Sequence, residues 1–214
     1  MRFLFLLLTV SLGAALAYGW MIRRPGTSAM RSVTKTAAVA ALALFAYAVN
    51  GPPLLVLALA LSALGDLLLS RDGDRAFLGG MIAFLAAHLA YVPLFLNLGD
   101  SALIALRWPV LAVLALFGLA MMRVLWTGLG DFRLPVMVYM LALLAMGAAA
   151  LALPLDGVNA LIPLGAALFI LSDSILALEK FHLAPDAPLR RVTPFAVWGL
   201  YWLAQALITY GVLW

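Results

Sequence analysis

Long apolar segments recur along almost the whole chain, separated by short gaps that contain charged residues, proline and glycine. A bilayer core about 30 Å thick is crossed by about 20 apolar residues in a helix that rises about 1.5 Å per residue. We therefore expect an all-α, polytopic transmembrane bundle, and with no linker between segments we expect residues 1–214 to form a single domain. The eight expected helices are Phe3–Ile22, Val33–Val49, Pro53–Ser70, Ala76–Leu96, Trp108–Trp126, Leu134–Leu153, Asn159–Leu178 and Phe195–Trp214.

Composition agrees with a membrane protein and excludes several other classes. The chain is 67% hydrophobic and only 10% charged, whereas a soluble domain is about half apolar and about a quarter charged. It has no cysteine, which excludes disulfides, thiolate metal sites and cysteine nucleophiles. The net charge is +4, but the basic residues lie in short gaps between apolar segments, so we expect membrane lipids as partners and no nucleic acid.

The distribution of Lys and Arg predicts the orientation. Eleven of the 13 basic residues flank the gaps after the first, third, fifth and seventh helices, and only Arg2 and Arg107 lie on the other side. The positive-inside bias places those four gaps in the cytoplasm and both termini outside. We expect the protein to lie in the plasma membrane. The first apolar segment resembles a signal peptide, but a basic cluster follows it closely, so we expect it to be retained as an anchor: Arg23, Arg24, Arg31 and Lys35.

A weak internal similarity suggests two related halves. The segment Ala60–Asp66 in the third helix parallels Ala167–Asp173 in the seventh, and each is followed by a short connection and another helix. Two four-helix halves would have the same orientation, so the hypothesis is a parallel repeat about an axis along the membrane normal.

Two aspartates lie inside the expected spans, where an ionisable group is unfavourable unless it faces a partner or a water-filled cavity. Asp66 is four residues from the cytoplasmic end of its helix, a depth of roughly 6 Å, and Asp173 is five residues in, at roughly 7–8 Å. The two carboxyls can therefore occupy one layer. His88 is expected deeper, roughly 18 Å along its helix.

Polar and aromatic residues at helical spacing accompany the aspartates. Trp198, Tyr201, Gln205 and Thr209 form one stripe in the last helix, at intervals of three to four residues. A second stripe in the fourth helix consists of Phe84, His88, Tyr91 and Phe95. Tyr139 in the sixth helix can enter the same interior.

Two carboxyls in one low-dielectric site do not titrate alike, so one can stay protonated near neutral pH while the other is ionised. The first can act as a general acid and the second can orient or deprotonate water. This division of roles suits hydrolysis through an oxocarbenium-like intermediate, as for acetals or enol ethers. His88, Tyr201 and Gln205 could then position water or donate hydrogen bonds to a substrate.

Other interpretations remain open at this level. Either aspartate could pair with Arg71, Lys35 or Lys180 as a membrane anchor, and His88 could be an interhelical hydrogen-bond donor. A multi-histidine zinc site is implausible with two histidines, and the Gly-x-Gly-Asp pattern of intramembrane aspartyl proteases is absent at Asp66. A proton-coupled transporter of a small amphiphile is the main alternative, because intramembrane carboxylates also mark proton pathways.

Four segments, in this order, resemble the YhhN family of multi-span membrane proteins, which includes the animal lysoplasmalogenases. They are Leu64–Leu69, Phe77–Gly80 together with Ala83–Tyr91, Leu168–Ser174 and Tyr201–Ile208. The resemblance covers nearly the whole chain. It implies an eight-helix bundle that hydrolyses the vinyl ether bond of lysoplasmalogen, a lysophospholipid, releasing a fatty aldehyde without a metal or organic cofactor.

Carried over by position, the resemblance implies that Asp66 and Asp173 are the acid/base groups. It places His88, Tyr91, Tyr201 and Gln205 around them, and Lys35 matches a basic position at the start of the second helix. Thr36 follows Lys35 where we expect the family to favour proline, which implies a difference at the entrance. Since some members occur in organisms without plasmalogens, the resemblance does not define the natural substrate.

Overall fold

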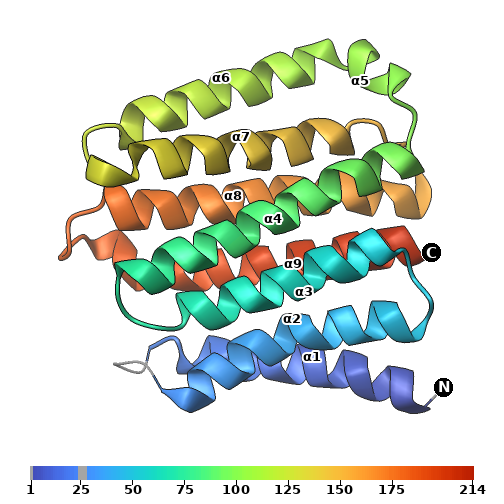
Figure 1. The fold of residues 1–214 in the computed structure, drawn as a ribbon, viewed down its shortest axis with the longest axis horizontal. Coiled ribbons are helices and arrows are strands. Elements are labelled where there is room, and N and C mark those ends of the chain that lie inside the picture. The colour runs from blue at the N-terminus through green and yellow to red at the C-terminus, as the bar shows by residue number, and fades with distance from the viewer. Residues whose placement is uncertain (1, 24–27) are drawn as a thin grey trace.

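The computed structural model describes residues 2–23 and 28–214, and most of them lie in eight long helices placed side by side (Figure 1). Within these residues there is no strand, which confirms the expected all-α bundle. Arg24, one of the cations counted for orientation, lies outside the described residues. The long helices are α1 (Arg2–Met21), α2 (Ala29–Ala48), α3 (Pro53–Leu69), α4 (Asp74–Leu98), α6 (Trp108–Leu125), α7 (Arg133–Ala150), α8 (Leu161–Phe181) and α9 (Thr193–Leu213).

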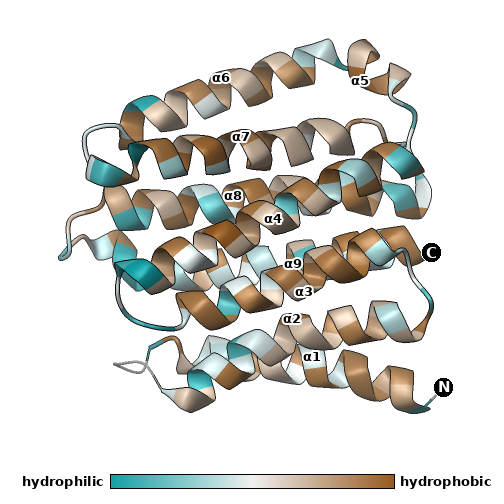
Figure 2. Ribbon diagram, viewed as in Figure 1, coloured by the Kyte–Doolittle hydropathy of each residue, from teal (hydrophilic) through white to brown (hydrophobic). Residues whose placement is uncertain are grey.

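By length and composition, seven of these helices can cross a membrane, and the eighth, α3, is an apolar helix of 17 residues. Hydrophobic residues cover the middle of the helices, and hydrophilic residues gather mainly at their ends (Figure 2). The start of α1 and the end of α9 lie at the same end of the bundle (Figure 1), as an even number of crossings requires. The protein is therefore an integral membrane protein.

Helix boundaries differ from the expected ones where short polar signals act. α2 begins at Ala29, four residues before the expected Val33, because the Ser28 side chain caps the helix and accepts a hydrogen bond from the Arg31 N–H at 3.2 Å. α8 continues to Phe181, three residues beyond the expected end. A short helix, α5 (Ala102–Leu106), joins α4 to α6 and was not expected, because five residues are too few for a periodic pattern.

The turn between α2 and α3 is as tight as its sequence predicts. Asn50 has a positive φ of 56°, a conformation that asparagine tolerates better than most residues. The N–H of Gly51 donates to the carbonyl of Ala46 at 2.8 Å and so satisfies one of the last carbonyls of α2. Pro52 and Pro53 then start α3, which fixes α2 and α3 as neighbours.

Close helix pairs form around small residues. α3 packs along α4, and α8 packs along α9. A Cβ on Gly65 would lie 2.6 Å from the Phe84 ring, and one on Gly165 would lie 2.9 Å from the Ala204 carbonyl oxygen, so glycine is needed at both approaches. These two pairs have corresponding places in the proposed four-helix halves, and the repeat stays a prediction that they support. α4 packs against α7 and joins the halves, while α6 lies on the outside.

Candidate active site

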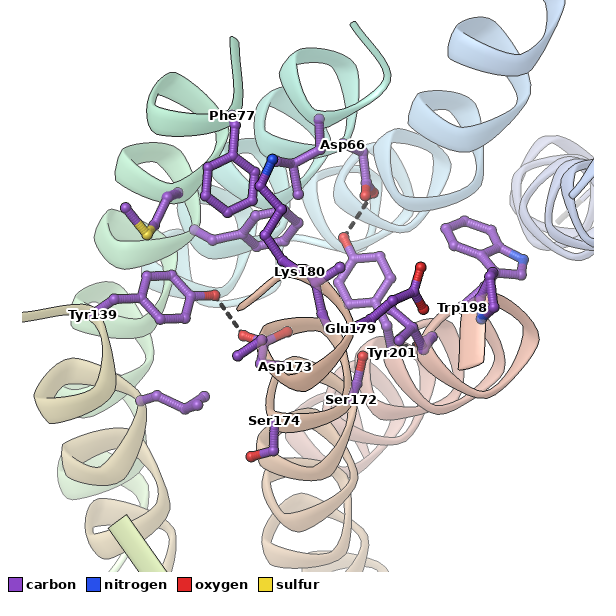
Figure 3. A pocket seen from close by; sticks show the side chains of 18 of the residues that line it. Asp66, Phe77, Tyr139, Ser172, Asp173, Ser174, Glu179, Lys180, Trp198 and Tyr201 are labelled. Carbon is purple, nitrogen blue, oxygen red and sulfur yellow. Dashed lines mark hydrogen bonds between the residues drawn. The ribbon is translucent and has the colours of Figure 1, made fainter. Parts of the chain in front are cut away.

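A cavity of about 530 Å³ lies at the end of the bundle where α3 and α8 end and α4, α7 and α9 begin. Five of the eight residues expected at the site line it: Lys35, Asp66, Tyr139, Asp173 and Tyr201. Figure 3 shows Asp66, Tyr139, Asp173 and Tyr201 around this space. Its other walls are largely apolar and aromatic. The two aspartates, which come from opposite halves of the chain, therefore share one space.

Asp66 is held in a buried ion pair. Its side chain is 1% exposed, and the Lys35 ammonium lies 3.2 Å from Oδ1. The Tyr201 hydroxyl donates a hydrogen bond to Oδ2 at 2.7 Å. The Lys35 ammonium also lies over the Tyr18 ring, 5.9 Å from its centroid. Of the three cations considered as partners from the sequence, the structure selects Lys35, and this pairing favours the ionised form of Asp66.

Asp173 has a different environment. Its Oδ2 accepts a hydrogen bond from the Tyr139 hydroxyl at 2.5 Å and lies 3.3 Å from His88 Nε2. The Tyr139 hydroxyl and His88 Nε2 are themselves 3.0 Å apart. Among the described residues, no Lys or Arg pairs with this carboxyl, and its side chain is 11% exposed. Since no described residue donates to Oδ1, that oxygen is available to a molecule in the cavity.

His88 lies closer to Asp173 than the sequence predicts. The expected difference in depth was large, but α8 extends to Phe181 and α4 crosses its neighbours obliquely (Figure 1). Asp173 is thereby placed deeper, and its level meets that of His88. The histidine is fully buried and does not line the cavity. It therefore contacts Asp173 from the side that faces away from the cavity.

Tyr91 and Gln205 do not reach the cavity, contrary to the expectation that they surround the aspartates. The Tyr91 hydroxyl donates to Gln205 Oε1 at 2.5 Å, and both side chains are fully buried. Gln205 lies one turn beyond Tyr201 on α9, farther from the helix end that forms the cavity. The two residues form a buried polar pair behind the site.

Two phenylalanine rings connect the surroundings of the two aspartates. The Phe169 ring lies 5.3 Å from the Tyr201 ring and 4.8 Å from the His88 ring, measured between centroids. The Phe84 ring contacts both Phe169 and Tyr201 edge to face, at 6.3 and 5.5 Å. The two rings thus hold Tyr201, which contacts Asp66, and His88, which contacts Asp173, in fixed positions relative to each other.

The cavity includes further polar residues that were not expected at the site. Glu179 and Lys180 lie in the last turn of α8, and Arg190 Nη1 is 3.9 Å from Glu179 Oε1. An acidic residue at a helix C-terminus, where cations are favoured, was a signal in the sequence for Glu179. Other unexpected lining residues are Tyr18, Phe77, Ser172, Ser174 and Trp198.

Together these residues make a site with two unequal carboxyls, hydroxyl donors and cations, set in apolar walls. One carboxyl is paired with a cation and the other has an oxygen open to the cavity. This combination suits general acid/base chemistry on an amphiphilic molecule.

Known proteins are similar to this chain over most of its length. Lysoplasmalogenases of Mycobacterium bovis and Mycobacterium tuberculosis are each 35% identical to the chain over 162 residues, which is 73% of this chain and 59% of the relative. The chain thus spans about three fifths of the length of these curated relatives. No solved structure matches it. The YhhN family model matches residues 30–212, which include every residue of the two aspartate environments except Tyr18, and the chain belongs to the YhhN family.

Proposed function

We propose that this protein is a membrane-embedded lipid hydrolase that cleaves the vinyl ether bond of lysoplasmalogen-like lysophospholipids. The observation that carries the proposal is the pair of unequal carboxyls, Asp66 and Asp173, on one cavity inside a membrane protein. The similarity to the two mycobacterial lysoplasmalogenases supports the same reaction. A lysolipid also suits a cavity that has apolar walls and charged groups at its helix-end rim.

In the first step, we assign Asp173 as the general acid. Its Oδ2 is held by Tyr139 and His88, and its Oδ1 faces no donor among the described residues, so Oδ1 can carry the proton. That proton passes to the second carbon of the alkenyl chain, and the carbon–carbon double bond supplies the electron pair. The first carbon and the ether oxygen then share the positive charge of an oxocarbenium ion.

In the second step, Asp66 acts as the ionised partner. Its negative charge, maintained by Lys35, stabilises the oxocarbenium ion, and it accepts a proton as water attacks the first carbon. The product of this attack is a hemiacetal. The hemiacetal hydroxyl returns a proton to Asp173 while Asp66 protonates the glycerol oxygen, the carbon–oxygen bond breaks, and aldehyde and alcohol leave with both carboxyls restored.

The reaction can be tested with purified protein in detergent or nanodiscs. We expect aldehyde release from a lysoplasmalogen, and none from the matching lysolipid with a saturated ether. In heavy water, the aldehyde formed at early times should carry one deuteron on its second carbon, because protonation occurs there. Absence of aldehyde from wild-type protein that is folded would contradict the proposal.

Proton-coupled transport is the second candidate, and the buried Tyr91–Gln205 pair favours it because this pair continues the polar residues beyond Tyr201 into the bundle. Transport predicts proton flux into sealed vesicles that depends on an amphiphile, with no chemical change in it. Hydrolysis predicts aldehyde with or without a sealed membrane. The same vesicle preparation therefore separates the two functions.

A further inference from the structure

A second, almost wholly apolar hollow lies beside the cavity, between α4 and α7. It has a volume of about 290 Å³ and is lined only by apolar side chains and Tyr139. We call it the α4–α7 groove, and its lining residues are Leu78, Met81, Ile82, Leu85, Leu134, Pro135, Val138 and Tyr139. The residues from α4 lie at positions i, i+3, i+4 and i+7 and so form one continuous stripe on that helix.

The groove opens toward the surrounding lipid. Its outer residues are exposed, with Ile82 at 56%, Leu134 at 69% and Val138 at 44%, whereas Met81 at its inner side is 9% exposed. Exposed apolar side chains on a transmembrane helix face lipid chains. The groove therefore runs from the lipid-facing surface of α4 and α7 toward the interior of the bundle.

Met81 and Tyr139 line both the groove and the cavity. Only these two side chains are shared among the described residues, so they form the partition between the two spaces. Tyr139 is also the residue that donates to Asp173. The inner end of the groove therefore lies next to the carboxyl with an available oxygen.

We infer that the α4–α7 groove holds the hydrocarbon chain of the lipid substrate and that Met81 is the gate between groove and cavity. This inference rests on the proposed function and adds the direction in which the substrate lies. In a vinyl ether, the carbon that receives the proton belongs to the hydrocarbon chain, and the oxygen belongs to the glycerol part. A chain leaving past Tyr139 puts that carbon beside Asp173 and leaves the glycerol part toward Lys35 and Asp66.

The groove should act on the position of the substrate more than on its affinity. Lipid tails are as apolar as the leucine and isoleucine side chains of the groove, so moving a chain from the bilayer into it gains little free energy. Misplacing the reacting bond by about 1 Å can reduce turnover by about a hundredfold. Blocking the groove is therefore expected to lower kcat for long chains with a smaller change in KM.

The test compares two lysoplasmalogens, one with a hexadecenyl chain and one with a butenyl chain too short to pass Tyr139. Met81→Trp places a bulky ring at the gate, and Ile82→Trp fills the exposed outer part of the groove. We expect both variants to lower kcat for the hexadecenyl substrate by about a hundredfold. Only Ile82→Trp, which lies outside the cavity, should leave kcat for the butenyl substrate within about twofold of the wild type. Leu116→Trp, at an exposed position on α6 that lines neither space, is the matched control. It should have the wild-type kcat for both substrates.

The possible failures are distinguishable. If folded wild-type protein releases aldehyde from neither substrate, the proposed function is overturned. If the wild type is active and Ile82→Trp affects both chain lengths equally, only the groove assignment is overturned. Ile82→Trp keeps the test decisive if Met81→Trp does not fold, because Ile82 is exposed and its replacement leaves the core intact.

Discussion

Asp66 and Asp173 lie near the ends of α3 and α8 and share one cavity, but their partners differ in charge. Asp66 is nearly inaccessible and has a lysine and a tyrosine as partners, whereas Asp173 has a tyrosine and a histidine and one oxygen without a described donor. Similar sequence segments thus produce different electrostatic environments, because the partners come from other helices. The proposed reaction uses this difference by assigning the acid to Asp173 and the base to Asp66.

The largest effect is expected at the acid. Asp173→Asn keeps an acceptor for Tyr139 but removes the transferable proton, so aldehyde release should fall by about a thousandfold. Steady-state turnover of a lysoplasmalogen in nanodiscs measures this. Asp131→Asn, which replaces an aspartate outside the cavity between α6 and α7, should keep wild-type turnover. Turnover of Asp173→Asn close to that of the wild type would remove Asp173 from the proton transfer.

The next effect concerns stability at the ion pair. Lys35→Met leaves the Asp66 charge buried without its cation and should reduce the free energy of unfolding by about 3–5 kcal/mol. The double variant Lys35→Met with Asp66→Asn should recover most of this loss, since no buried charge is left unpaired. Unfolding in mixed micelles provides the measurement.

Lys35→Met with Asp66→Asn should nevertheless be inactive, because it lacks the proposed base. Equal stability losses in the single and the double variant would show that charge pairing is not what Lys35 contributes. Restored activity in the double variant would contradict the role given to Asp66.

A smaller effect should distinguish the two tyrosines. Tyr139→Phe removes a hydroxyl that donates to Asp173, the proposed acid, and Tyr201→Phe removes one that donates to Asp66, the proposed base. A hydrogen bond to a charged group contributes about 1.5–3 kcal/mol. In the proposed reaction Asp66 is charged from the start and Asp173 becomes charged as it gives up its proton, so each variant should lower kcat by about tenfold or more. The Tyr139 variant should show a greater kcat loss, because its hydroxyl also contacts His88. An unchanged kcat in both would indicate that neither hydroxyl positions a reacting carboxyl.

The smallest effect on turnover is expected at the buried Tyr91–Gln205 pair, which does not line the cavity. Tyr91→Phe leaves Gln205 without its donor and should reduce stability by about 1–3 kcal/mol, with turnover within about twofold of the wild type. Aldehyde release and thermal unfolding, measured on the same preparation, separate the two quantities. A tenfold loss of turnover at full stability would mean that the Tyr91–Gln205 pair participates in the reaction.

The helices could be predicted from the sequence because a bilayer imposes a minimum apolar length on every span. That rule located all eight, including the short α3, and the exceptions are local. Ser28 started α2 early through a cap, and α5 was too short to produce a pattern. Family membership and five residues of the cavity could also be predicted, among them Tyr139, which was expected in the interior from its position alone.

The partners of the aspartates were less predictable. A helical stripe places Tyr201 and Gln205 on one face of α9, but it does not say where the cavity ends, and Gln205 lies one turn beyond that point. The contact between His88 and Asp173 depends on the crossing of α4 over its neighbours and on the extra turn of α8. Such features arise from packing between helices, which residue spacing within one helix does not encode.

The pairing of Lys35 with Asp66 has a consequence for how the protein enters the membrane. These residues belong to successive spans, α2 and α3, joined by a turn of only Val49 to Pro52. A single Lys or Asp within an inserting helix is opposed, by about 2.5–3.5 kcal/mol at the helix centre and by less toward the helix ends, where Lys35 and Asp66 lie. Among the described long helices, α3 is also the shortest. When α2 and α3 insert together as a helical hairpin, the two charges reach the bilayer as a neutral pair. Lys35 is thus expected to offset the free-energy cost that Asp66 adds to the insertion of α3.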